Sequence, residues 1–133
     1  MQIVNWSELL QRIDRAHTGS EELDLRVLRA LYPLWEVWIE DETAKPWKAM
    51  VRTESGMVCH VRLDPFSRSL DEAIKLMPPG AEWRITNLYG IADVEAPLNG
   101  DESFSSRRKD GNIVLATLSV ALQVRAHDMD NQH

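Results

Sequence analysis

The chain has 133 residues, with 21 acidic against 15 basic side chains and a formal net charge of −6. This length suits one domain over residues 1–133, large enough to bury a core without a metal or a disulfide. The acidic balance argues against nucleic acid as the main ligand, because phosphate binding needs clustered Lys and Arg. The only cysteine, Cys59, excludes an intramolecular disulfide and is typical of a reducing compartment. We therefore expect a globular, cytoplasmic protein.

Neither a targeting segment nor a membrane span is predicted. The N-terminus lacks the basic region and the apolar core of a secretory signal. The longest largely apolar stretch, 113–122, has ten residues, whereas a membrane-spanning helix needs about 20. This stretch is therefore expected to be a buried core segment, and no membrane partner is expected.

The N-terminal third predicts two helices. Asn5 or Ser7 is suited to cap the first helix. Ser20 is suited to cap the second, which Pro33 ends. The expected buried positions recur at helical spacing and are Trp6, Leu9, Leu10 and Ile13, followed by Leu23, Val27, Leu28 and Leu31.

The middle of the chain predicts strands, because apolar and polar residues alternate over 35–40, 47–52 and 57–63. The last two segments flank residues 53–56, a connection that ends in Gly56 and is typical of a hairpin. Trp47, Ala49 and Val51 are expected to share one face with Cys59, Val61 and Leu63.

The second half begins with a capping box at Ser69 and Glu72, which predicts a helix that ends at residues 78–80. Segments 82–88 and 91–95 predict a hairpin. Residues 97–111 are rich in Pro, Gly, Ser and charge, and are expected to be a mobile loop. Asn112 is suited to cap a last helix that ends near His127, leaving residues 128–133 as a frayed tail.

This order predicts an α+β domain: a small, mostly antiparallel β-sheet sandwiched between α-helices in α/β/α layers. We expect about four helices and four to five strands.

Three blocks of the sequence, residues 6–31, 65–85 and 113–127, together resemble the phage ABA-sandwich domain, a small family of tailed phages and prophages. The most specific block is a serine-capped helix followed by a Pro-Gly turn and a Trp-led strand. It is carried here by Ser67, Ser69, Leu70, Asp71, Ala73, Leu76, Pro78, Gly80, Trp83 and Arg84. The chain departs from the family pattern by an extra residue between Gly80 and Trp83, and segment 97–111 has no clear family counterpart.

The resemblance implies a sheet covered by helices and a phage or prophage origin. The protein would then lie in the cytoplasm of the bacterial host or be associated with the virion. The family motifs are helix punctuation and core, so the resemblance transfers no site residues.

The residues that could carry catalysis or bind a ligand have structural explanations. Cys59 and His60 are adjacent on a predicted strand and so point to opposite faces, which argues against a Cys–His pair. The histidines show no metal-ligand spacing, and no glycine-rich phosphate loop is present. The carboxylate pairs 71–72 and 101–102 are explained by helix capping and by a solvated loop. We therefore predict no catalytic residue, cofactor, metal or small-molecule ligand.

The basic run Arg107-Arg108-Lys109 is flanked by acidic residues, and segment 97–111 is neutral overall. This composition favours a solvated loop over a nucleic-acid contact.

The candidate partner patch lies near Trp38. Residues 1–42 carry nine carboxylates against four arginines, so nearly all the net negative charge lies there. If 35–40 is a strand, Trp38 projects opposite Trp35, and an exposed Trp is a credible protein-binding anchor. The alternative is that a helix covers this face and makes Trp38 part of the core. The candidate patch comprises Glu36, Trp38, Glu40, Asp41 and Glu42.

Three functional hypotheses remain at this point. The first is a non-enzymatic phage accessory module that binds another protein or its own copies. The second is an acidic anti-host-defence or nucleic-acid-mimicking inhibitor, which would block a DNA- or RNA-binding site through its carboxylates. The third is a small hydrolase with an unrecognised site.

Overall fold

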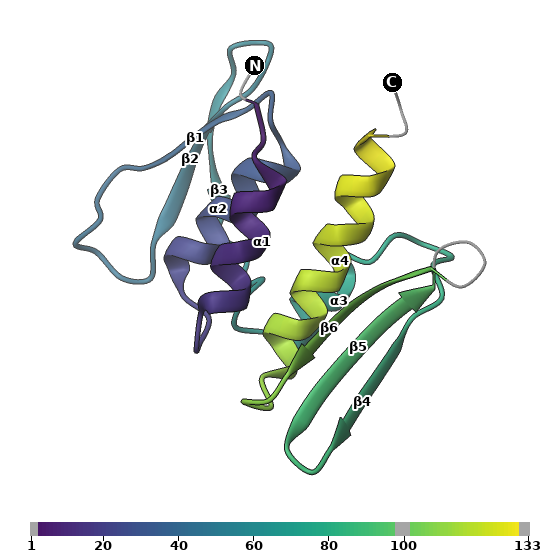
Figure 1. The fold of residues 1–133 in the computed structure, drawn as a ribbon. Helices are drawn as coiled ribbons and strands as arrows, with labels where there is room; N and C mark the ends of the chain where they lie inside the picture. The colour runs from purple at the N-terminus through teal and green to yellow at the C-terminus, as the bar shows by residue number, and fades with distance from the viewer. Residues whose placement is uncertain (1–2, 98–101, 131–133) are drawn as a thin grey trace.

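The computed structural model describes residues 3–97 and 102–130, and its ribbon is drawn in Figure 1. The described part contains four helices and six strands. In chain order they are α1 (Trp6–Arg15), α2 (Glu21–Leu31), β1 (Glu36–Ile39), β2 (Lys48–Arg52), β3 (Val58–Arg62), α3 (Leu70–Lys75), β4 (Arg84–Leu88), β5 (Ile91–Pro97), β6 (Ser103–Arg108) and α4 (Ile113–Asp130). The α+β class and the four helices are confirmed.

The helices begin where the sequence predicts. The side chains of Asn5, Ser20 and Ser69 accept hydrogen bonds from backbone N–H groups in the first turns of α1, α2 and α3. Asn112 does the same for α4, where Leu115 N–H donates to its side-chain oxygen at 3.0 Å. These caps satisfy donors that have no partner inside a helix.

The strands form two separate antiparallel sheets, ordered β1-β2-β3 and β4-β5-β6. In the predicted hairpin β2–β3, Val51 lies opposite Cys59 and Ala49 opposite Val61, so these residues share one face as predicted. Gly56 between the two strands has φ +87°, a left-handed conformation that favours glycine. The hairpin β4–β5 turns at Tyr89 and Gly90, as predicted.

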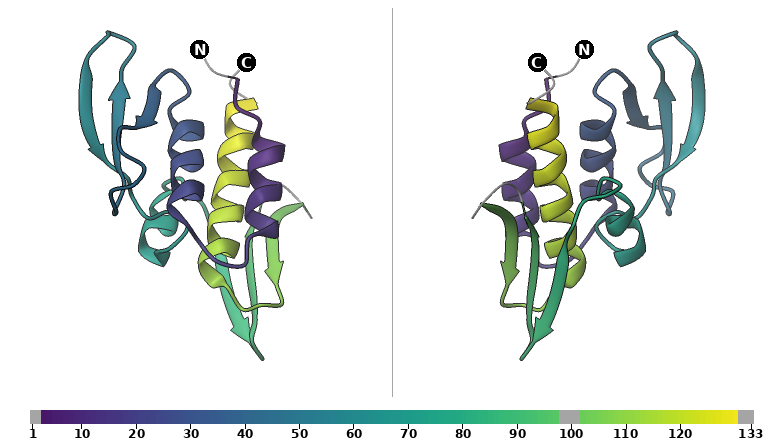
Figure 2. Two further views of the ribbon diagram at one scale, coloured as in Figure 1. Left: turned by 90° about the vertical axis from the view of Figure 1, so that its left-hand side faces the viewer. Right: turned by 90° about the vertical axis from the view of Figure 1, so that its right-hand side faces the viewer.

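Two features of the predicted sheet differ in the structure. The strands number six, and they divide between two sheets instead of forming one. Figures 1 and 2 show α1, α2 and α4 lying between these two sheets. Each sheet is a meander of three consecutive strands, and the helix layer keeps the two meanders apart.

The mobile loop predicted over 97–111 is wrong for residues 103–108, which form β6 and pair with β5. On this strand Phe104, Ser106 and Arg108 face inward. Burial therefore alternates along the strand, but two of the three inward residues are polar and the sequence shows no alternation of apolar residues. Residues 98–101 lie outside the described part. The last helix continues to Asp130, beyond its predicted end near His127, and residues 131–133 also lie outside the described part.

The core is one cluster of buried residues shared by the helices and both sheets. Its centre is α4, in which every residue from 115 to 122 is buried. This helix packs against β5, β6, α1 and α3. Helix α2 meets the first sheet, where the guanidinium of Arg29 donates to the carbonyl of Val37 at 2.9 Å.

Candidate functional site

Two members of the predicted patch, Glu36 and Trp38, lie on the face of the first sheet that points away from the helices. The opposite, inner face carries the buried side chains of Val37, Ala49 and Val51. No helix among the described residues packs on the outer face, which we call the open face (Figure 2). It comprises Glu36, Trp38, Lys48, Met50, Arg52, Val58, His60 and Arg62, which alternate with the inner residues along β1, β2 and β3.

The open face is organised in cross-strand rows. Trp38 pairs with Met50, and Met50 pairs with His60, so these three residues form the central row. Glu36 pairs with Arg52 in a flanking row, and their side chains form an ion pair of 3.1 Å. An apolar and aromatic centre is therefore bordered by charge.

Trp38 is half-buried and lies outside the buried core. The guanidinium carbon of Arg52 is 5.8 Å from the centroid of its ring, within the range of a cation–π contact. Of the two interpretations of Trp38, the structure therefore favours the exposed position over the core position.

The other members of the predicted patch follow β1 in the connection to β2. The carboxylate of Asp41 accepts hydrogen bonds from the hydroxyl and the backbone N–H of Thr43, which lower the pKa of Asp41. Glu40 and Asp41 line a hollow of about 380 Å³ together with Lys45, Lys48 and His60, among others. The carboxylates predicted to form an acidic patch are thus interleaved with cations. The sequence analysis did not assign Lys45, in the same connection, or Lys48, on β2, to the patch.

The connection between β1 and β2 is tied to the start of α2. Glu21 accepts a hydrogen bond from the backbone N–H of Trp47 and pairs with Lys45 at 3.2 Å. The Trp47 N–H is the main cause that lowers the pKa of Glu21, and Lys45 acts in the same direction. The ammonium of Lys45 also lies 3.9 Å from the Trp47 ring centroid. These contacts fix the position of Trp47 beside the open face.

A larger pocket, of about 700 Å³, opens beside Trp47 at the end of the β2–β3 ladder. Its apolar wall and its cationic rim come from residues that the sequence analysis did not assign to a site. The lining residues are Pro46, Trp47, Lys48, His60, Val61, Arg62, Leu63, Pro65 and Arg68. We call this the Trp47 pocket.

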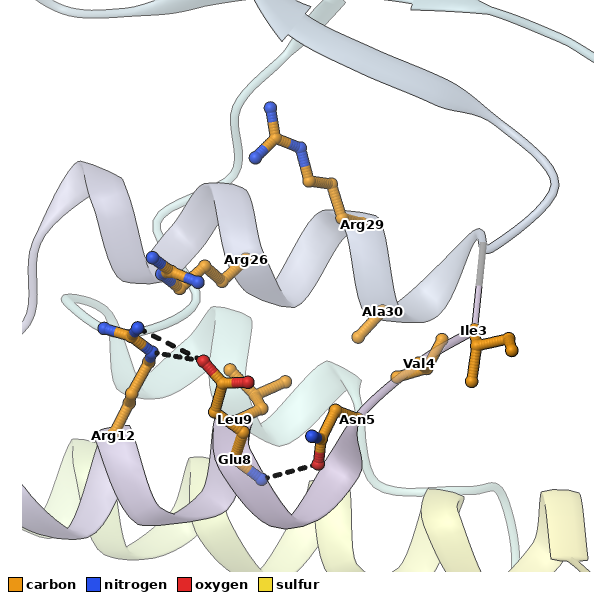
Figure 3. Close-up of a pocket in the computed structure, with 9 residues that line it drawn as sticks. All are labelled: Ile3, Val4, Asn5, Glu8, Leu9, Arg12, Arg26, Arg29 and Ala30. Carbon is orange, nitrogen blue, oxygen red and sulfur yellow. Dashed lines mark hydrogen bonds and ion pairs between the residues drawn. The ribbon is translucent and has the colours of Figure 1, made fainter. Parts of the chain in front are cut away.

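A smaller pocket, of about 180 Å³, lies between α1 and α2 and is drawn in Figure 3. Its cations are engaged by other groups of the protein: Arg12 pairs with Glu8 at 3.2 Å, and Arg26 pairs with Glu22 at 3.4 Å. Arg29 points away from the others in Figure 3 and donates to Val37. An anion entering this pocket would compete with contacts that already exist.

The basic run 107–109 is split by the fold. Arg108 is buried and donates to the carbonyls of Ile13 and Ala16 at the end of α1, and it pairs with Asp110 at 2.7 Å. Arg107 and Lys109 are exposed, and they line a shallow hollow with Arg15 and His17, among others. The run therefore does not act as one cationic patch.

The remaining candidates are separated as the sequence predicts. Cys59 packs against the core, whereas His60 is exposed on the open face. Glu72 lies in the first turn of α3 and pairs with Lys75.

Among the described residues no group of three or more His, Cys, Asp or Glu is placed to hold a metal ion. In the same part of the chain, no helix is both long enough and apolar enough to cross a membrane.

Comparisons of the chain with models of protein families, with curated proteins and with solved structures found no match. The resemblance to the phage ABA-sandwich domain thus depends on the three sequence blocks alone.

Proposed function

We propose that the protein is a non-enzymatic interaction module that binds another protein through the open face of its first sheet. The observation that carries this proposal is the row of Trp38, Met50 and His60, which no helix of the described part of the chain covers, with Val58 beside it at 48% exposure. Trp, Met and Arg are enriched in protein–protein interfaces, and charged residues are typical of the rim. The open face has this arrangement.

The charge distribution supports a protein partner over the nucleic-acid mimic. A mimic requires carboxylates spaced along one surface without intervening cations. Here Glu36 pairs with Arg52, and Glu21 pairs with Lys45. The acidic residues at the start of the chain therefore form a mixed surface, which suits a partner with charges of both signs around an apolar contact.

The sequence resemblance supports placing this module among phage or prophage accessory proteins. The identity of the neighbouring genes tests this part of the proposal. Genes for head and tail proteins would argue against an anti-defence role, whereas a position among early genes would favour one. Absence of any phage genes nearby would contradict the proposed origin.

The interaction itself is tested by site-specific photo-cross-linking in the producing cell. A photoreactive phenylalanine analogue replaces Val58 on the open face or, as the control, Leu88 on β4. Both residues are exposed strand residues, at 48% and 61%. We expect a discrete protein adduct from position 58 and none from position 88. The mass of the adduct tells a second copy from a different protein.

Competition makes the cross-linking result specific. Added wild-type protein should suppress the adduct at position 58, whereas the Trp38→Ser variant should not. Equal adducts at both positions, or equal suppression by both competitors, would contradict the assignment of the open face.

A further inference from the structure

We infer that the Trp47 pocket binds an acidic segment of the partner protein that carries an apolar or aromatic side chain. The inference rests on the proposed function and names the chemistry of the partner. The pocket adjoins the open face, because Lys48, His60 and Arg62 belong to both. A partner that covers the open face would therefore reach the pocket.

The side chains that line the Trp47 pocket carry positive charge. Its lining contains Lys48, Arg62 and Arg68 as well as His60, and it contains no Asp or Glu. This composition is opposite to that of the chain, whose net charge is −6. Cations gathered around a partly enclosed hollow attract anionic groups and raise the rate of their association.

The cations of the pocket rim differ in how strongly carboxylates of the protein already engage them. Arg68 is bound to the buried carboxylate of Asp24 at 2.8 Å, so it adds charge but offers fewer free donors. Arg62 lies 3.6 Å from Asp64, which is a loose pair, and its side chain is 75% exposed. Lys48 forms no salt bridge within the described part of the chain. Lys48 and Arg62 are cross-strand neighbours, and we assign the anion contact to this pair.

The wall of the Trp47 pocket is apolar. Trp47, Val61 and Leu63 supply apolar surface, and Pro46 and Pro65 extend it. The indole N–H of Trp47 donates to the carbonyl of Glu42 at 3.0 Å, so the ring is held in one orientation. Cations alone would suit any anion. An apolar wall beside them favours a carboxylate-rich segment with an apolar anchor over a fully hydrated anion.

The test uses fluorescein-labelled nonapeptides and fluorescence anisotropy on the full chain. The probe has a central Phe between two runs of four Glu. One control peptide has Ser in place of Phe, and the other has Lys in place of Glu. We expect the probe to bind at least tenfold more tightly than either control, with an affinity that falls as salt rises. No binding of the probe, or equal binding of a control, would overturn the inference.

Charge reversal locates the contact. Arg62→Glu and Lys48→Glu should each weaken the probe at least tenfold, and Lys48→Gln serves as the milder variant if a reversal impairs folding. Arg84→Glu is the matched control, because Arg84 lies on a strand of the other sheet and is 74% exposed against 75% for Arg62. Equal loss in the Arg84 variant would overturn the assignment.

Binding of ATP is measured in the same way, because a nucleotide also combines anionic groups with a flat aromatic ring. ATP that binds more tightly than the peptide, with the same dependence on Lys48 and Arg62, would overturn the assignment to a protein segment. Failure of the peptides together with a specific cross-link at position 58 would refute this inference and leave the proposed function intact. Peptide binding without the cross-link would refute the open face as the interface and leave the acidic ligand of the Trp47 pocket intact.

Discussion

At the scale of single residues, the fold depends on a buried polar junction between the start of α2 and the segment before α3. Asp24 is fully buried and accepts hydrogen bonds from the backbone N–H of Ser67 at 2.7 Å and from its hydroxyl at 2.6 Å. Arg68 pairs with the second oxygen of the same carboxylate. Asp24 lies in the first turn of α2, where an acidic residue is ordinarily exposed. Its burial depends on a partner 43 positions away, and no local pattern could reveal it.

Gly19 is the residue that lets this junction close. A Cβ atom at this position would lie 1.9 Å from the carbonyl oxygen of Ser67. We therefore expect Gly19→Ala to lower the free energy of unfolding by about 3 kcal/mol, since a backbone clash forces the two segments apart. Urea denaturation measures the change, with the exposed neighbour Thr18→Ala as control. Equal stability of the Gly19 variant and wild type would contradict the close approach.

Thr117 is a buried hydroxyl without a hydrogen-bond partner among the described residues. Replacing it with Val keeps the shape of the side chain and removes the unsatisfied group. We expect Thr117→Val to raise the free energy of unfolding by about 1 kcal/mol. Ser119, also on α4, is the control, because its hydroxyl accepts a hydrogen bond from Gln123, so Ser119→Ala should bring no gain. A loss of stability in Thr117→Val would show that the hydroxyl has a partner.

At the scale of elements, the sequence predicted those with strong local signals and missed those without them. The helix caps and the two hairpins were predictable because serines, asparagines and glycines stand at positions that the backbone itself requires. Strand β6 was missed because two of its three inward positions are polar: Ser106 and Arg108 take the place of an apolar pattern. The outward cationic neighbours of Trp38 were also missed, because their proximity depends on the register of three strands.

The turn between β4 and β5 places a residue other than glycine in the left-handed conformation. Tyr89 has φ +53° and is fully exposed, and Gly90 follows it with φ +75°. Asn tolerates this conformation better than Tyr. We expect Tyr89→Asn to raise the free energy of unfolding by about 1 kcal/mol, measured by thermal unfolding. Tyr89→Ala removes the same ring but keeps the backbone cost, so an equal gain there would contradict this explanation.

The contact between β6 and α1 makes part of the stability depend on pH. Hydrogen bonds from Arg108, followed by the backbone N–H of Asn112, lower the pKa of Asp110 from 3.8 to about 2. Because the pKa is lowered in the folded state, this stabilisation is present above the unfolded value near 3.8 and is lost as the pH falls towards 2. We expect Asp110→Asn to flatten the fall of the melting temperature between pH 5 and pH 2. An unchanged slope would contradict the pairing with Arg108.

At the scale of the whole molecule, the two sheets lie on opposite sides of one helix layer (Figure 1). The α+β class follows from the order of elements, which the sequence shows. The division into two sheets does not follow from that order, because the order does not show that helices lie between the first three strands and the last three. The candidate site was predicted at Trp38 and its acidic neighbours. The structure adds the cations of β2 and β3 and the Trp47 pocket beside them.

The most direct test of the open face is the affinity of the cross-linked partner for two aromatic variants. Trp38→Ala removes the proposed anchor, and Tyr89→Ala removes an exposed aromatic ring from the other sheet. Titration calorimetry with the purified partner, or sedimentation if the adduct is a second copy, gives both dissociation constants. We predict that Trp38→Ala weakens binding about 30-fold, the loss of about 2 kcal/mol typical of an interface anchor, and that Tyr89→Ala leaves it within twofold. Unchanged binding by Trp38→Ala, or an equal loss in both variants, would contradict the account.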